Sequence, residues 1–319
     1  MNAAVLRQGR TQLMFDFPED VRAYVQNIFG GANAYSSTYL TQVPNAHEPA
    51  LDIALVSYIA RHSRPVHLPS DWVVKLDTHF LGSGHHWRQW EIADIGLLLM
   101  FRRRGELLRT KVALLQSKRL YPNEQKRGDE ADYVGFGRLH ESDEAFLASL
   151  APRNFTFKPE SRYKALSIES GQYSAITDYE MLSQIPVYYF FYNPTHIPVT
   201  IELPCTTPDA PADDIKVGCS VLPAQVFRDD VAPKLEGLTP SYADLCLAQS
   251  KPFDDADNTA GWRLDDFVVN RFMGCQTGYR VDTKTDTTLA NLFGGRSAPI
   301  SAAISINIDV PQGVDPIEA

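Results

Sequence analysis

Two polar residues interrupt an otherwise apolar run at residues 111–120, KVALLQSKRL. Gln116 and Lys118 are separated by one residue, so in a β-strand their side chains point to the same face. A buried amide and a buried ammonium are unfavourable unless other polar groups pair with them. An ammonium held beside a bound metal can orient a water and offset negative charge that develops in a reaction. The pair therefore predicts a functional site, and a carboxylate is needed there to hold the metal.

Asp94 supplies that carboxylate on a neighbouring strand. Residues 91–101 and 107–120 are apolar runs joined by a short turn around Gly105, which predicts a β-hairpin. Asp94 lies early on the first strand and Lys118 late on the second. The hairpin ladder brings these two positions to the same end of the sheet, where Asp94 can hold a metal.

The Gln-x-Lys pattern is weak evidence by itself. The tripeptide Gln-Ser-Lys occurs a second time at residues 249–251, directly before Pro252 and without a strand pattern around it. The alternative interpretation of the first copy is that Gln116 and Lys118 face solvent on a one-sided sheet. The hairpin and Asp94 distinguish the first copy from the second.

The surrounding sequence predicts the elements that position these residues. Apolar residues recur at helical spacing over residues 47–63, and Glu48 lies in the first turn of that helix. A polar, broken stretch at 121–163 reads as an insertion, with a short helix near 143–150. The elements predicted between 47 and 193 are a helix at 47–63, strands at 71–81, 91–101 and 107–120, a helix at 170–184 and a strand at 187–193.

The two ends of the chain are predicted in less detail. A short helix begins after Pro18 and ends at Gly30-Gly31, and residues 311–319 read as a frayed tail. In between, the C-terminal third combines strand-like and helical patterns. The predicted segments are strands at 214–224 and 303–310 and helices at 242–248 and 262–275.

The order helix, three strands, helix, strand, with Asp94 on the second strand and Gln116-x-Lys118 on the third, resembles the PD-(D/E)XK nuclease superfamily. The Gln form resembles its branch of Mrr-type endonucleases. The resemblance covers residues 45–195. It implies an α/β fold with a restriction-endonuclease-like core and a C-terminal α+β extension. The corresponding divisions are an N-terminal helical segment at 1–44, the core at 45–195 with its insertion, and a region of unknown role at 196–319.

Two positions depart from the family pattern. Ala93 stands where the family name has proline, and Gln116 replaces a carboxylate, so one negative ligand is missing. Family members with that substitution often carry an acidic residue on the first helix, and Glu48 matches it. Glu91 is the competing acidic ligand. Its odd spacing from Asp94 turns it to the opposite face, if the strand already runs there.

The resemblance implies metal-dependent hydrolysis of DNA. Mg²⁺, for which Mn²⁺ can substitute, takes oxygen ligands, which Asp94, Glu48, the Gln116 amide and the Ser117 backbone carbonyl would provide. Lys118 would orient the attacking water. Asp94, Gln116, Lys118 and Glu48 are therefore the predicted catalytic residues.

Basic residues near the hairpin predict contacts to phosphate groups. Arg102, Arg103 and Arg104 form a cluster at the hairpin turn, and Arg119 follows Lys118. The functional interpretation places them at the mouth of the site, where they contact the nucleic acid. The alternative for the turn cluster is a solvated loop.

Composition limits the classes of function. The net charge of −9 opposes general nucleic-acid binding and makes a local basic patch necessary. The sequence has no apolar run of membrane-spanning length and no secretory signal, and its four scattered cysteines read as reduced thiols, so we expect a cytoplasmic protein without a membrane partner. The expected function is an effector nuclease of a prokaryotic defence or restriction system, restrained or loaded with DNA by a partner protein or by self-association. The alternative is a nuclease-fold module that binds or assembles without catalysis.

Overall fold

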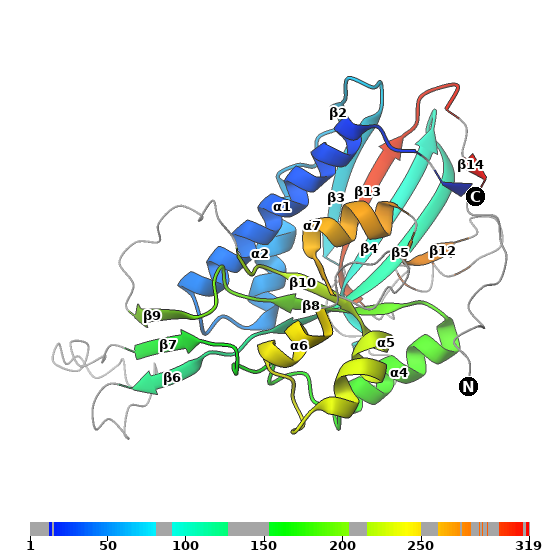
Figure 1. Cartoon of the computed structure of the whole chain (residues 1–319). Helices are drawn as coiled ribbons and strands as arrows, with labels where there is room; N and C mark the ends of the chain where they lie inside the picture. The colour runs from blue at the N-terminus through cyan, green and yellow to red at the C-terminus, as the bar shows by residue number, and fades with distance from the viewer. Residues whose placement is uncertain are drawn as a thin grey trace, which may run out of the picture.

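A large mixed sheet with helices on both faces forms the body of the protein in the computed structural model (Figure 1). The mixed α/β class expected from the sequence is confirmed. The structure describes residues 13–14, 16–80, 91–126, 153–203, 216–249, 261–274, 276–281, 287, 289, 292, 300–314 and 317–318. The helix predicted at 143–150 lies outside these residues.

Within the described residues, the main sheet has nine strands, in the order β11-β10-β8-β5-β4-β13-β3-β2, with β12 paired to β5. The β4–β5 hairpin is confirmed, and β5 also pairs in parallel with β8. The strand bounds are β2 Val66–His67, β3 Val73–Phe80, β4 Ala93–Arg103, β5 Glu106–Arg119, β8 Val187–Tyr192, β10 Ser220–Pro223, β11 Trp262–Arg263, β12 Tyr279–Val281 and β13 Ile300–Asp309.

β13, which comes last in the chain among the strands of this sheet, lies in its middle. It pairs antiparallel with β3 and parallel with β4, so the first two strands of the expected core are not neighbours. Its apolar residues Ile304, Ile306 and Ile308 are buried, which accounts for a central position. The main sheet therefore includes part of the region 196–319, namely β10, β11, β12 and β13, and these strands do not form an extension beside it.

Helices cover both faces of the sheet. α1 (Glu19–Gln42) and α2 (Glu48–Ala60) pack against each other, and α2 also contacts β3 and β5. On the opposite face α4 (Gly171–Ser183) packs beside α5 (Ala224–Val226), which contacts β8. The remaining helical segments are η2 Phe227–Val231, η3 Ala232–Lys234, α6 Tyr242–Gln249, α7 Leu264–Asp266 and η4 Phe267–Met273.

α1 is much longer than the short helix predicted to end at Gly30-Gly31. The second glycine is a packing position and not a stop signal, because a Cβ placed on Gly31 would lie 2.1 Å from the hydroxyl oxygen of Tyr58 on α2. The helix continues and buries Ala32 and Leu40. Gly31 therefore permits the close approach of α1 and α2.

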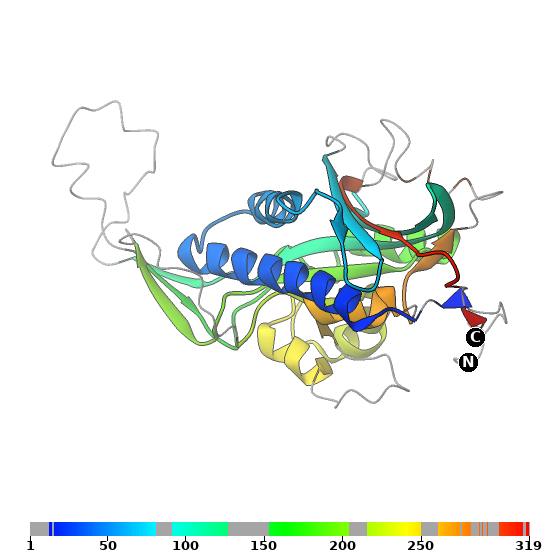
Figure 2. The same ribbon diagram turned by 90° about the horizontal axis from the view of Figure 1, so that it is seen from above.

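A small three-stranded sheet projects from one side of the body (Figure 2). Two of its strands, β6 (Asn123–Lys126) and β7 (Arg153–Phe157), come from the two ends of the predicted insertion, and the third is β9 (Val199–Leu203). The insertion thus has more regular structure than expected at its ends. In the tail, β14 (Ile317–Glu318) pairs with β1 (Leu13–Met14), which frayed residues would not do.

Among the described residues, no helix has both the length and the apolar character needed to cross a bilayer.

Candidate active site

The site lies where β4 begins and β5 continues past it. The last paired residues of the hairpin at this end are Ile95 and Leu115, whereas β5 runs on to Arg119 with β8 on its other side. Beyond Leu115, the N–H groups of alternate residues of β5 point towards the edge of the strand that β4 no longer pairs with. These are the N–H groups of Ser117 and Arg119, and each of them donates to a carboxylate.

Asp94 receives the first of these donors. Its Oδ2 accepts a hydrogen bond from the Ser117 backbone N–H at 2.6 Å and another from the Gln116 side-chain amide at 2.5 Å. Asp94 and Gln116 therefore meet across the hairpin, as the sequence predicted. Gln116 and Lys118 are only 2% and 3% exposed, which excludes the solvent-facing alternative.

Glu48 receives the second donor, from the first turn of α2. Its Oε1 accepts from the Arg119 backbone N–H at 3.1 Å. Two residues of a strand span about 7 Å, so the two N–H groups that Asp94 and Glu48 accept lie about that far apart along one edge of β5. The Ser117 carbonyl points to the same edge, between the two N–H groups, because N–H and C=O of one residue share an edge. Two carboxylates and one carbonyl thus form a row.

Asp52 is a further acidic residue of the site, and it was not predicted from the sequence. Its Oδ1 accepts from the Ser117 hydroxyl at 2.5 Å and from the Tyr192 hydroxyl at 2.8 Å. It lies one helical turn after Glu48 on α2, and it is 8% exposed. A carboxylate placed among the apolar residues of α2 was the signal that could have identified it.

The buried carboxylates favour their neutral forms. Burial raises the pKa of Asp94 well above its ordinary value, the charge of Asp52 raises it further, and the ammonium of Lys118 opposes the shift. Burial likewise raises the pKa of Asp52 to about 7, although its hydrogen bonds from Ser117 and Tyr192 act in the opposite direction. Such shifts are typical of functional sites, where acidic groups are held close together.

Lys118 projects from the opposite face of β5 to Ser117 and meets α4. Its Nζ donates to the side-chain oxygen of Gln172 at 3.0 Å, and the Gln172 amide donates to the Glu91 backbone carbonyl at 3.1 Å. Gln172 therefore fixes the ammonium in place. The ammonium of Lys118 lies close enough to Asp94 and Asp52 that its charge acts to lower the pKa values of both.

Glu91 stands nearer to Asp94 than its odd spacing suggested. β4 begins at Ala93, so the alternation of a strand does not apply to Glu91. Its charge acts to raise the pKa of Asp94, whereas the charge of Glu48 acts on Asp52 and Arg119. The carboxylate of Glu91 also accepts a hydrogen bond from the Ser301 hydroxyl on β13. Both acidic candidates therefore border the site, from different elements.

The Gln116 amide has one buried atom without a partner. Its Nε2 donates to Asp94, but its Oε1 accepts no hydrogen bond from any residue that the structure describes. An unpaired oxygen beside a carboxylate is a place where a cation can bind. Within the described part of the chain, however, no group of three or more His, Cys, Asp or Glu side chains is arranged to hold a metal. Any ion would therefore use amide and carbonyl oxygens as well as carboxylates.

The arginine cluster does not lie at the mouth of this site, contrary to expectation. Arg102 and Arg103 end β4, nine residues of strand from Asp94, which corresponds to about 30 Å. Arg102 donates to the Gly105 carbonyl within the turn, and Arg103 donates to the Val314 carbonyl. The hairpin that brings Asp94 to Lys118 necessarily sends its turn, including Arg104, to the far end of the sheet.

Arg119 lies beside the site but is largely buried. Its guanidinium donates to the Pro44 carbonyl at 3.2 Å and to the Ala46 carbonyl, and it lies 4.0 Å from the ring centre of Tyr121. With an exposure of 4%, it anchors the loop between α1 and α2 to the end of β5. The second Gln-Ser-Lys differs, since Gln249 ends α6 and residues 250–251 lie outside the described residues.

Comparisons with known proteins identify no relative of this chain. No protein-family model matches the chain, and no curated protein or solved structure is significantly similar to it.

Proposed function

We propose that the protein is a metal-dependent nuclease with a restriction-endonuclease-like core formed by α2, β3, β4, β5, α4 and β8. The observation that carries the proposal is the row of Asp94, the Ser117 carbonyl and Glu48 along one edge of β5, with Lys118 buried beside it. The chain order of these elements and the parallel pairing of β5 with β8 agree with such a core.

The residues present fit a hard divalent cation. Mg²⁺ prefers oxygen ligands and keeps several waters, so it needs only one or two carboxylates from the protein. Asp94 and Glu48 would provide these, with the Ser117 carbonyl and the unpaired Oε1 of Gln116 as neutral ligands. Bound Mg²⁺, or Mn²⁺ in its place, would neutralise phosphate charge and acidify a water.

Lys118 would act on the reacting phosphate and its water. The ammonium is a compact point charge with three donors, and only one of them is taken by Gln172. In a site shielded from bulk water, such a charge interacts strongly with an oxygen that becomes negative during the reaction. Gln172 is the positioning residue for Lys118, because its own amide is held by the Glu91 carbonyl.

The proposed substrate is DNA, in the setting of a prokaryotic defence or restriction system. With a net charge of −9, the protein would bind DNA weakly at physiological salt, so a protein partner or self-association would deliver the substrate or restrain the nuclease. Since the C-terminal strands belong to the sheet, a partner would bind the folded body and not a separate C-terminal unit.

The test is cleavage of supercoiled plasmid DNA by the purified chain with Mg²⁺, with Mn²⁺ and with EDTA, at about 150 mM salt, where charges are strongly screened. Conversion to nicked or linear DNA in either metal, and none in EDTA, supports the proposal. The RNA arm uses a labelled transcript under the same conditions. If neither nucleic acid is cut at high protein concentration, the chain is better described as the non-catalytic binding or assembly module.

A further inference from the structure

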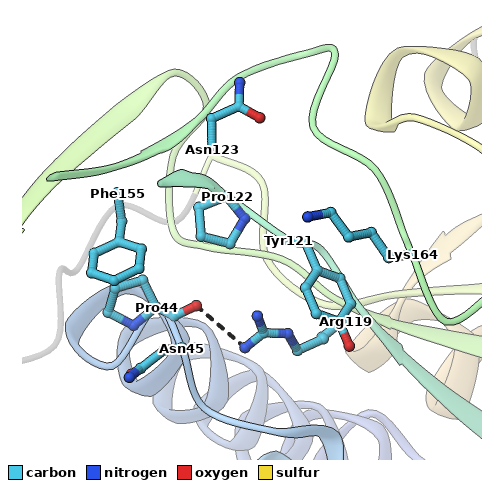
Figure 3. Close-up of a pocket in the computed structure, with 8 residues that line it drawn as sticks. All are labelled: Pro44, Asn45, Arg119, Tyr121, Pro122, Asn123, Phe155 and Lys164. Carbon is cyan, nitrogen blue, oxygen red and sulfur yellow. Dashed lines mark hydrogen bonds between the residues drawn. The ribbon is translucent and has the colours of Figure 1, made fainter. Parts of the chain in front are cut away.

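A pocket opens directly beyond the carboxyl end of β5, next to the proposed active site (Figure 3). It has a volume of about 560 Å³. The α1–α2 loop, the start of β6, β7 and the chain around Lys164 surround it. The carboxyl ends of parallel strands such as β5 and β8 are a common location for ligand sites.

The lining of the pocket is basic. Arg119 and Lys164 contribute two cations, Asn45 and Asn123 contribute two side-chain amides, and no lining residue is acidic. In a protein with a net charge of −9, a pocket with this composition selects for an anion. Within the described residues, Lys164 forms no ion pair, and its contact is with the ring of Tyr121, 5.6 Å from the ring centre.

A buried donor of Arg119 has no partner among the described residues. Two main-chain carbonyls accept from one terminal nitrogen of its guanidinium, whereas its Nε–H donates to none of these residues. Burial lowers the pKa of Arg119, since the cation is removed from water, and nearby Glu48 counteracts the shift. A buried guanidinium with a free donor at a basic pocket is a built site for an oxyanion.

We infer that this pocket binds a phosphate group of the nucleic-acid strand that the proposed active site cuts. The inference rests on the proposed function for the identity of the ligand. Arg119 is two residues from Ser117 on β5, about 7 Å along the strand, so a backbone bound here runs onto the Asp94–Glu48 edge. The pocket would thereby supply the local phosphate contact that the distant arginine cluster at the hairpin turn cannot provide.

The experiment measures binding of a short labelled oligonucleotide, as single strand and as duplex, to the full chain in EDTA over a series of salt concentrations. Lys164→Gln removes one cation of the pocket, and Lys158→Gln is the matched control, an exposed lysine outside the lining. We expect Lys164→Gln to weaken binding roughly three- to tenfold, and to lower the slope of log affinity against log salt by about one. Lys158→Gln should stay within about twofold of the parent.

Equal affinities and slopes for the two variants would overturn the inference. The inference would also be overturned if the parent chain bound inorganic phosphate or an acidic peptide, and Lys164→Gln abolished that binding, while the oligonucleotide did not bind. Because the assay contains no metal, its outcome is independent of catalysis. Absence of Mg²⁺-dependent cleavage with a clear Lys164 effect would reject only the proposed function, whereas normal cleavage without that effect would reject only the phosphate pocket.

Discussion

At the residue level, the carboxylates of the site satisfy main-chain donors, and in the proposed function they would also bind the metal. Asp94 and Glu48 accept the main-chain N–H groups of Ser117 and Arg119, which no strand pairs at this end of β5. Removing either acceptor leaves a donor unsatisfied and costs about 1–3 kcal/mol where that donor is buried. We therefore expect alanine substitutions here to lower the melting temperature, and isosteric substitutions are needed to isolate a chemical role.

Glu48→Gln is such a substitution, because the glutamine oxygen can still accept from the Arg119 N–H. The variant loses one negative ligand from a site that has few, so we expect the Mg²⁺ concentration for half-maximal cleavage to rise about tenfold with an unchanged melting temperature. The measurement is a Mg²⁺ titration of plasmid cleavage.

The comparison variant for Glu48→Gln is Glu91→Gln, which retains an acceptor for the Ser301 hydroxyl. It should alter the Mg²⁺ requirement less than Glu48→Gln does. A larger effect at Glu91 would identify it as the acidic ligand, and would leave Glu48 as a support for the end of β5.

Asp52 makes stability depend on pH. Its folded-state pKa of about 7 lies above the ordinary value of 3.8, so its favourable contribution is complete below pH 3.8 and is lost as the pH rises through about 7. The shift corresponds to about 4 kcal/mol at most. Asp52→Asn keeps an oxygen for the Ser117 and Tyr192 hydroxyls but cannot ionise.

We therefore expect Asp52→Asn to raise the melting temperature relative to the parent at pH 8, to raise it by less at pH 5, and to match the parent only near pH 3.8 and below. Thermal unfolding in EDTA across this range checks the expectation, with the exposed Asp230→Asn as the control. A difference between Asp52→Asn and the parent that does not grow with pH would show that Asp52 stays charged in the fold.

At the level of elements, two adjacent glycines of α1 offer a matched test of helix packing. A Cβ on Gly31 would collide with the Tyr58 side chain, whereas a Cβ on Gly30 meets no atom within 4 Å. Both substitutions to alanine gain about the same helix propensity, roughly 1 kcal/mol. We expect Gly30→Ala to raise the free energy of unfolding measured in denaturant. Gly31→Ala should have a lower free energy of unfolding than Gly30→Ala. Equal stabilisation would mean that Tyr58 moves away at no cost.

Local patterns were sufficient to predict the elements that carry the site. The hairpin, α2 and the meeting of Asp94 with Gln116 all follow from spacing within about 70 residues. The length of α1 could not be predicted, because Gly30-Gly31 is a normal stop signal and only the distant Tyr58 explains its tolerance. The position of β13 was also hidden, since a strand pattern shows burial but not which neighbours the strand pairs with.

At the level of the whole molecule, β13 connects the strands that carry the site to the rest of the sheet. β13 separates β3 from β4, and its removal would leave two long strands with unpaired edges and an exposed apolar face. We expect a chain truncated after Pro299 to be insoluble or unfolded by circular dichroism and gel filtration. A chain truncated after Val314 keeps β13 and should remain folded. A soluble, cooperative fold without β13 would instead support an independent core at 45–195.

The arrangement of the sheet places the arginines of the hairpin turn and the basic residues of the pocket at opposite ends of β5. The arginines of the hairpin turn lie about 30 Å from Asp94, so they can assist only in holding a long duplex. Arg119 and Lys164 lie at the end of β5 that carries the site. The acidic edge and the basic pocket are therefore adjacent, as metal-dependent cleavage of a polyanion requires.

The most direct test of this account is Lys118→Met, assayed together with Lys251→Met from the second Gln-Ser-Lys. Methionine preserves an unbranched side chain of similar length and removes only the ammonium. We predict that Lys118→Met reduces Mg²⁺-dependent cleavage by at least about 100-fold while it still binds Mn²⁺, and that Lys251→Met cuts like the parent. Parental cleavage by Lys118→Met, in protein that is folded and free of contaminating nuclease, would contradict the assignment of the active site.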